Sequence, residues 1–263
     1  MNTKHKIKAI FFDIDGTLLS FKTHVVPPST IEAFSKLKKQ GIKLFIATGR
    51  ALGEINNLDD LTFDGYISMN GAYCVNSTYE VIHKDAIPSE DIDALIRYLE
   101  EEEQFPCIAT TAENNVVNCL NEQMLALSRL VDLPLPQIKN FREIDKDHIF
   151  QLALFVDQQK ETEIMQNVLV HCQSSRWHHS FADANKMGVS KQSGIDRMLE
   201  YHGIQLSETM AFGDGGNDIS MLQHVAIGVA MGNADENVKS VADYVTDSVD
   251  DDGIMKALQQ LLW

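Results

Sequence analysis

The chain has 263 residues, 44% of them hydrophobic, which is enough for one large domain or two modest ones with a sizeable core. Its net charge of −16 argues against nucleic acid or an anionic membrane as a partner, because the chain has no basic stripe. The four cysteines form no Cys-x-x-Cys pair, which disfavours a zinc knuckle or a thioredoxin-like site. No apolar run approaches the ~18 residues of a membrane span, so we expect a soluble, cytoplasmic protein.

The first apolar run ends in two aspartates and a glycine turn, in the sequence IFFDIDGTLL over residues 10–19. Side chains alternate along a strand, so Asp13 and Asp15 should project to the same side. Unpaired carboxylates are costly to bury, and the pair therefore predicts a divalent cation together with a phosphate. Gly16 permits a tight turn that brings backbone N–H groups towards an anion, and Thr17 adds a hydroxyl.

The first part of the chain alternates strands and helices, which predicts a parallel sheet. The helix after the first strand should begin with a capping box of Ser29 and Glu32 and end at Gly41. A short helix should follow the second strand. The expected strands cover residues 8–14, 43–48 and 65–69, and the first helix covers 29–40.

The pattern changes after Asn70-Gly71-Ala72, where a hairpin around Asn76 and an acidic helix over 89–104 are expected. The alternation of strands and helices resumes at Gly188. Its expected elements are a helix over 190–202, strands over 210–214 and 225–230, and a helix after residue 253. The sequence thus predicts a doubly wound, Rossmann-like α/β core of residues 1–82 and 184–263, with a smaller α/β cap domain inserted at 83–183.

Two motifs resemble those of the haloacid dehalogenase superfamily. The segment DIDGTL is similar to its first motif, and this resemblance implies that Asp13 is a nucleophile and Asp15 an acid and base. The second expected strand ends in Thr48-Gly49-Arg50 before a helix, where backbone N–H groups form an anion site. An ordinary threonine N-cap would explain that triplet alone, but beside Asp13 it resembles the second motif.

The segment Gly188-Val189-Ser190-Lys191 resembles the third motif of the superfamily. Ser190 is a standard N-cap, but a lysine in the first helical turn opposes the helix dipole, which predicts an anion nearby. The resemblance implies that Lys191 neutralises the nucleophile and the phosphate. Many relatives have glycine after this lysine, whereas this chain has Gln192.

The sequence FGDGGND over residues 212–218 follows an expected strand and resembles the fourth motif. A dinucleotide fingerprint is excluded because Asp218 occupies its last glycine position. Convergence of Asp13, Asp15, Asp214 and Asp218 predicts magnesium, which prefers carboxylate oxygens, waters and phosphate. The resemblance implies Asp214, Asp13 and the backbone carbonyl of Asp15 as direct ligands, with Asp218 behind them and Asn217 holding the phosphate or Lys191.

The closing segment TDSVDDDGI, residues 246–254, resembles that of Cof-type members of the superfamily. The combined resemblance implies magnesium-dependent hydrolysis of small phosphate monoesters, such as sugar phosphates, through an aspartyl-phosphate on Asp13. A phosphomutase with the same motifs and a non-catalytic sugar-phosphate sensor are the alternatives. His178 and His179, near the return from the inserted domain, are expected to be surface histidines, with contact to the substrate as the alternative.

Overall fold

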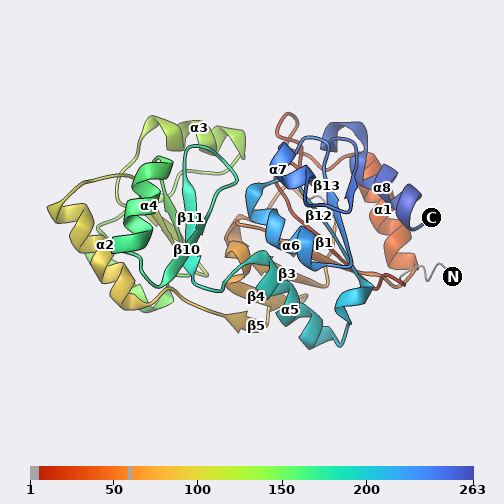
Figure 1. Ribbon diagram of the computed structural model, residues 1–263, viewed down its shortest axis with the longest axis horizontal. Coiled ribbons are helices and arrows are strands. Elements are labelled where there is room, and N and C mark those ends of the chain that lie inside the picture. The colour runs from red at the N-terminus through yellow and green to blue at the C-terminus, as the bar shows by residue number, and fades with distance from the viewer. Residues whose placement is uncertain (1–5, 59–60) are drawn as a thin grey trace.

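The computed structural model describes residues 6–58 and 61–263, and these form two lobes, each built on one sheet (Figure 1). In the larger lobe, the described residues form a sheet of eight strands in the order β14-β13-β12-β1-β2-β3-β4-β5. Strands β14 to β3 run parallel, and the hairpin β4-β5 adds two antiparallel strands at one edge. The strands are β1 Ala9–Phe12, β2 Lys43–Ala47, β3 Gly65–Ser68, β4 Tyr73–Asn76, β5 Val81–Lys84, β12 Thr209–Gly213, β13 Ile227–Ala230 and β14 Tyr244–Val245.

Helices cover both faces of the larger sheet, as a doubly wound fold requires. Phe12 packs with Phe34 on the face covered by α1 and α8, whereas Phe11 and Phe45 belong to the cluster under α5 and α6. Successive strand residues thus feed opposite layers, which explains why these strands read as continuous apolar runs. The predicted α/β class is confirmed. The helices are α1 Pro28–Lys39, α5 Lys191–His202, α6 Ile219–His224, α7 Glu236–Lys239 and α8 Gly253–Leu261.

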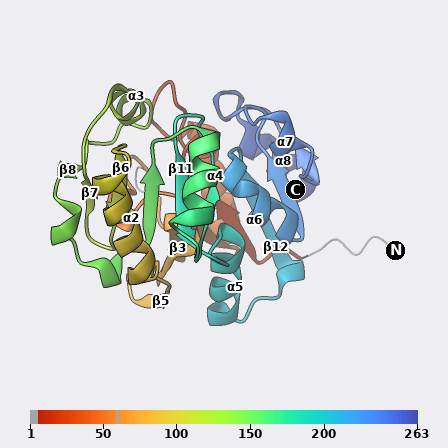
Figure 2. The ribbon, with the colours of Figure 1, turned by 60° about the vertical axis from the view of Figure 1, so that its left-hand side comes forward.

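The smaller lobe is also α/β, with strand order β10-β11-β9-β6-β7-β8. Helices α2 and α4 cover one face of this sheet and share a hydrophobic core with it (Figure 2). Its opposite face is turned towards the larger lobe, and α3 packs against that face through Met124 and Leu127. The elements are α2 Ser89–Glu101, β6 Cys107–Thr110, β7 Asn115–Val117, α3 Glu122–Leu130, β8 Gln137–Ile138, β9 Gln151–Leu154, α4 Gln158–Asn167, β10 Cys172–Ser175 and β11 Ala182–Lys186.

Two local features bear on the predictions. Strand β5 belongs to the larger sheet and ends at Lys84, and β11 belongs to the smaller sheet and ends at Lys186, while the insertion of residues 83–183 stays a prediction. The capping box of Ser29 and Glu32 is wrong: α1 starts at Pro28, whose fixed φ already suits the first helical turn. Instead of capping, the Ser29 hydroxyl donates to Asp252. Among the described helices, none combines the length and apolarity needed to cross a membrane.

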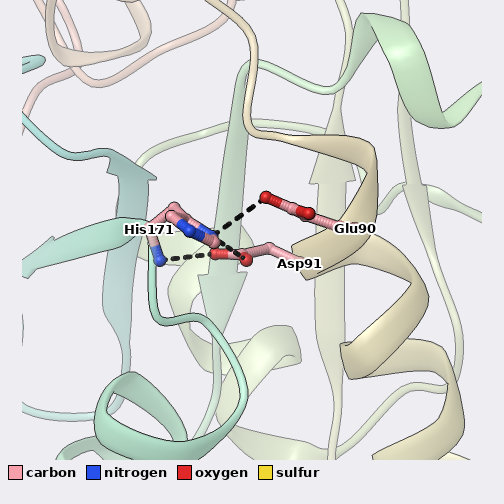
Figure 3. Close-up of side chains that lie close together, drawn as sticks. All are labelled: Glu90, Asp91 and His171. Atoms are coloured by element: carbon pink, nitrogen blue, oxygen red, sulfur yellow. Dashed lines mark hydrogen bonds and ion pairs between the residues drawn. The ribbon is translucent and has the colours of Figure 1, made fainter.

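One acidic side chain fastens α2 to the start of β10 in the smaller lobe. The buried Asp91 carboxylate accepts hydrogen bonds from the backbone N–H of His171 (2.9 Å) and from its Nδ1 (2.8 Å), as Figure 3 shows. Cys172 Sγ lies 3.4 Å from Asp91 Oδ2, and Glu90 lies 3.4 Å from His171 Nδ1. Because Asp91 is committed to these protein donors, the group serves as a clasp between a helix and a strand.

The hydrogen bonds between Asp91 and His171 predict a stability that depends on pH. The hydrogen bond to Asp91 raises the pKa of His171 above its ordinary 6.5, so its contribution to stability is full below that value and is lost as the pH rises through the raised pKa. In the Asp91→Asn protein, the pKa of His171 should fall, as NMR titration of the imidazole would show. The titration of His83 on β5 should not change, and an unaltered His171 would refute the clasp.

Candidate active site

Three carboxylates meet where β1 and β12 end at the same edge of the larger sheet. The two strands are parallel neighbours with Phe12 opposite Phe212, and the Asp13 N–H donates to the carbonyl of Phe212 (3.0 Å). This register brings one oxygen each of Asp13, Asp214 and Asp218 to within 4.8 Å of one another. Asp13 and Asp218 are buried, so water screens their repulsion little.

Lys191, the first residue of α5, places a fully buried ammonium group in this cluster. Its Nζ lies 2.7 Å from Asp13 Oδ1 and 2.6 Å from Asp218 Oδ1. The close approach of α5 depends on Gly71, where an added Cβ would lie 2.2 Å from the Ser190 carbonyl oxygen. The anion predicted beside Lys191 is therefore Asp13 together with Asp218, and Gln192 leaves the lysine in place.

The cluster fits a divalent cation because one ammonium faces three carboxylates. Burial and Asp218 raise the pKa of Asp13 to about 7, although Lys191 opposes the shift. Burial, Asp13 and Asp218 likewise raise the pKa of Asp214 well above its usual range. A hard cation with a preference for carboxylate oxygens would relieve this repulsion.

The Asp15 side chain stands apart from the cluster, which corrects the predicted convergence of four carboxylates. Arg50 Nε donates to Asp15 Oδ2 (2.8 Å), and Arg50 Nη2 donates to Asp15 Oδ1 (2.6 Å). Strand β1 already ends at Phe12, so strand alternation does not govern the direction of Asp15. Arg50 also donates to the carbonyl of Val131, in the smaller lobe (3.3 Å). Sequence reasoning missed Arg50, although it is the third residue of the predicted anion turn.

The turn after β1 is built around Asp214. Gly16 has a φ of 80°, and a Cβ there would lie 2.2 Å from Asp214 Oδ2. The buried Thr17 hydroxyl donates to Asp214 Oδ1 (2.7 Å), so this side chain orients the Asp214 carboxylate. Asn233, which no motif indicated, donates through Nδ2 to Asp214 Oδ2 (3.2 Å) and to the Gly16 carbonyl (2.9 Å).

The turn after β2 offers backbone donors. Thr48 is buried, and its Oγ1 accepts from the Arg50 N–H (3.1 Å). Within the described ranges, the Gly49 N–H has no protein acceptor, which leaves it available to an anion. The expected helix beyond this turn is only a single 3₁₀ turn, Leu52–Glu54. Asn217, in the loop after β12, donates to Asn70 Oδ1 (2.9 Å).

A cavity of about 270 Å³ lies between these turns and the smaller lobe. Asp13, Asp15, Thr48, Gly49 and Asn217 line its floor. Its roof is largely apolar and comes from α3, the residue after it and the segments that flank the strands of the smaller sheet, with Met124, Leu127, Val131, Phe155, Trp177 and Phe181. His178 also lines this cavity and accordingly is more than a surface histidine, whereas His179 is exposed.

The fold and the site together define a class: a doubly wound α/β protein that can hold a cation and an anion at one sheet edge beneath an inserted lobe. A family model for haloacid dehalogenase-like hydrolases matches residues 10–258. The chain therefore belongs to the haloacid dehalogenase-like hydrolase family, which confirms the resemblance found in the four motifs.

Relatives cover almost the whole chain. The Bacillus subtilis (strain 168) protein named "Putative phosphatase YkrA" is 35% identical over 97% of both chains. The solved structure of the HAD subclass IIB sugar phosphatase BT4131 is 46% identical, with a TM-score of 0.90 over 96% of this chain and 98% of that one. The phosphatase BT1666 from Bacteroides thetaiotaomicron is 41% identical, with a TM-score of 0.90 over 99% and 97%.

Magnesium should stabilise the protein through the carboxylate cluster. Millimolar MgCl₂ should raise the Tm of the wild type, because a ligand that binds only the folded state stabilises it. The Asp214→Asn protein should lose this response, because it lacks one of the three carboxylates of the cluster. Differential scanning calorimetry would measure both.

A control for this experiment is Asp147→Asn, which removes an exposed carboxylate from the smaller lobe. It should keep the wild-type response. A wild type whose Tm ignores magnesium, or an Asp214→Asn protein that keeps the full shift, would contradict this assignment.

Proposed function

We propose that this protein is a magnesium-dependent phosphatase that hydrolyses small phosphate monoesters through an aspartyl-phosphate on Asp13. The observation that carries the proposal is the pairing of Asp13 with the buried Lys191 ammonium at the floor of a cavity, 2.7 Å apart. An ammonium there can hold the nucleophile and offset the charge of an incoming phosphoryl group. The phosphatase names of the relatives support the same reaction class.

In the first half-reaction, an Asp13 oxygen forms a bond to phosphorus while the bond from phosphorus to the leaving oxygen breaks. Asp15 donates a proton to that oxygen, so the product leaves as an alcohol. In the second half-reaction, Asp15 takes a proton from water, whose oxygen attacks phosphorus and releases phosphate from Asp13. Lys191, the Thr48 hydroxyl and the Gly49 N–H hold the phosphoryl oxygens throughout.

Asp15 must change partners for this chemistry. Both of its oxygens accept hydrogen bonds from Arg50 in the present geometry, an arrangement suited to a carboxylate rather than to a proton donor. We therefore propose that substrate binding releases Asp15 from Arg50. Since Arg50 also contacts Val131, this release would be sensitive to the position of the smaller lobe.

The residues proposed to hold magnesium are Asp13, Asp214 and the backbone carbonyl of Asp15. Bound magnesium would neutralise charge on the phosphoryl oxygens. Asp218 fits a place behind these ligands, because its Oδ1 accepts from Lys191 and its Oδ2 accepts from the N–H groups of Asp214 (2.9 Å) and Gly215 (2.8 Å). Its role is to fix the lysine and the loop.

We propose that the inserted lobe is a cap that encloses the leaving group and excludes bulk water. The cavity is of a size for a small metabolite, and a sugar phosphate is the leading candidate because BT4131 is a sugar phosphatase. The roof residues Leu127 and Trp177 would pack against the carbon skeleton of the alcohol.

Phosphate release tests this function. Wild type and Asp13→Asn would be assayed for inorganic phosphate with a panel of esters, including hexose 6-phosphates, with and without magnesium. Loss of the nucleophile should lower kcat by about a thousand-fold or more. Asp147→Asn, a substitution outside the cavity, should retain the wild-type rate.

The outcomes separate the alternatives. Magnesium-dependent release that disappears in Asp13→Asn is the result we expect. Isomerised sugar phosphate without net release would instead indicate a phosphomutase. Binding of sugar phosphates with neither release nor isomerisation would indicate a sensor and would overturn the proposal.

A further inference from the structure

A line of polar side chains, three of them buried, crosses from the smaller sheet to the phosphate turns of the larger lobe. We name Asn217, Asn70, Gln151 and Asp183 the interface relay. Gln151 lies on β9 and Asp183 on β11, whereas Asn70 and Asn217 belong to the larger lobe. Asn70, Gln151 and Asp183 are 3%, 6% and 3% exposed, so their polar atoms depend on one another for hydrogen bonds.

Asp183 sets the polarity of the interface relay, because an ionised carboxylate can only accept hydrogen bonds. Asn70 Nδ2 donates to Asp183 Oδ2 (3.1 Å), and Gln151 Nε2 donates to Asp183 Oδ1 (3.3 Å). With its NH₂ group turned to Asp183, Asn70 must present its oxygen on the other side. That oxygen accepts the Nδ2–H of Asn217 (2.9 Å).

The interface relay touches both turns that would hold the phosphoryl group. Asn217 lines the cavity beside Asp214, and the direction of its amide follows from Asp183 two links away. Gln151 Nε2 also donates to the Gly49 carbonyl (3.0 Å), which fixes the peptide next to the free Gly49 N–H. Asn70 further holds this turn, because its backbone N–H donates to the Thr48 carbonyl (2.9 Å).

A contact that only held the two lobes together would not require a buried carboxylate. Burial raises the pKa of Asp183 to about 7, although Asn70 and the more distant Lys191 oppose the shift, so an ionised Asp183 carries a desolvation penalty. An apolar pair at this interface would avoid that penalty. What the carboxylate provides instead is a direction for each amide in the relay.

We propose that Asp183 is a positioning residue that, through Asn70 and Gln151, aims Asn217 and the Gly49 turn at the phosphoryl group when the two lobes meet. The interface relay thereby makes the phosphate pocket complete only when the smaller lobe is docked. This inference rests on the proposed function, since it assigns a phosphoryl group to the pocket.

The sharpest test is an exchange of the two relay groups. In Asp183→Asn, a single oxygen and an NH₂ group face two amide donors, so one donor is left facing another. The double variant Asn70→Asp with Asp183→Asn restores this pair, because the new carboxylate accepts from Asn217 and from the new amide. The match is partial, since Asn70 Nδ2 also donates to Gln151 Oε1 (3.0 Å) and the oxygen that replaces it faces that acceptor. Asp tolerates the left-handed backbone of Asn70 (φ 54°), and Gln151 Oε1 keeps a donor in Asn185 Nδ2 (3.4 Å).

Three quantities would be measured on folded protein well below the Tm: kcat and KM for the best ester, the Kd of inorganic phosphate with magnesium, and the NMR resonances of the Asn217 side-chain amide. Asp183→Asn should lower kcat/KM by about ten- to a hundred-fold, the effect of one mispaired buried hydrogen bond. It should weaken phosphate binding and shift the Asn217 resonances. The exchange variant should recover part of each loss, because the new carboxylate pairs again with Asn217 and the new amide but faces Gln151 Oε1. Asp147→Asn should match the wild type.

The inference is overturned if Asp183→Asn stays within two-fold of the wild type in kcat/KM and in phosphate affinity. It is equally overturned if the exchange variant recovers the Tm but neither phosphate affinity nor the Asn217 resonances, because the contact would then be structural only. A wild type without Asp13-dependent hydrolysis would refute the proposed function. Phosphate affinity and the Asn217 resonances would still decide the role of Asp183.

Discussion

The arrangement of the site depends on one buried ion group, in which the Lys191 ammonium lies between Asp13 and Asp218. Burying these charges is costly, and their mutual hydrogen bonds offset that cost only if every partner is held in place. The register of β1 with β12 supplies one side of the group, and the close approach of α5 across Gly71 supplies the other. The parallel sheet therefore brings the residues that follow β1 and β12 to one edge.

The same group would favour both a cation and an anion in the proposed site. Asp214 adds a third carboxylate that Lys191 does not contact, and Thr17 and Asn233 hold it in position. Cation binding would leave the ammonium, the Gly49 N–H and the Thr48 hydroxyl with a surplus of donors, which suits a phosphoryl group. Above them, Arg50 and the interface relay connect the site to the smaller lobe through hydrogen bonds.

Much of this could be predicted from the sequence, because charged residues at the ends of apolar strands are visible in it. Asp13 and Asp214 were found in that way, and Lys191 was found from its place in the first turn of a helix. The family and the α/β class are confirmed. The Asp15–Arg50 pair could not be predicted, since it depends on β1 ending at Phe12 and on a side chain that joins two loops. Thr17 bonding to Asp214 is likewise a contact between segments far apart in the chain.

The smaller lobe was the least predictable part, for a physical reason. Its strands and helices follow from periodicity, but no motif indicates which side chains face the cavity. Asp183 and Gln151 lie in ordinary strand segments. Only their hydrogen bonds with Asn70, across the interface between the lobes, set them apart. The predicted capping box of Ser29 is wrong for a similar reason, a contact between distant segments. The helix begins at Pro28, and the Ser29 hydroxyl donates to Asp252.

The most direct test of the central claim is to trap the covalent intermediate. The protein would be mixed with its best ester and magnesium, quenched rapidly in acid, digested and mapped by mass spectrometry. The account predicts a phosphoryl group on the peptide that contains Asp13, and none in the Asp13→Asn protein. Phosphate release without any modification of this peptide, or with a phosphoryl group on a different residue, would contradict it.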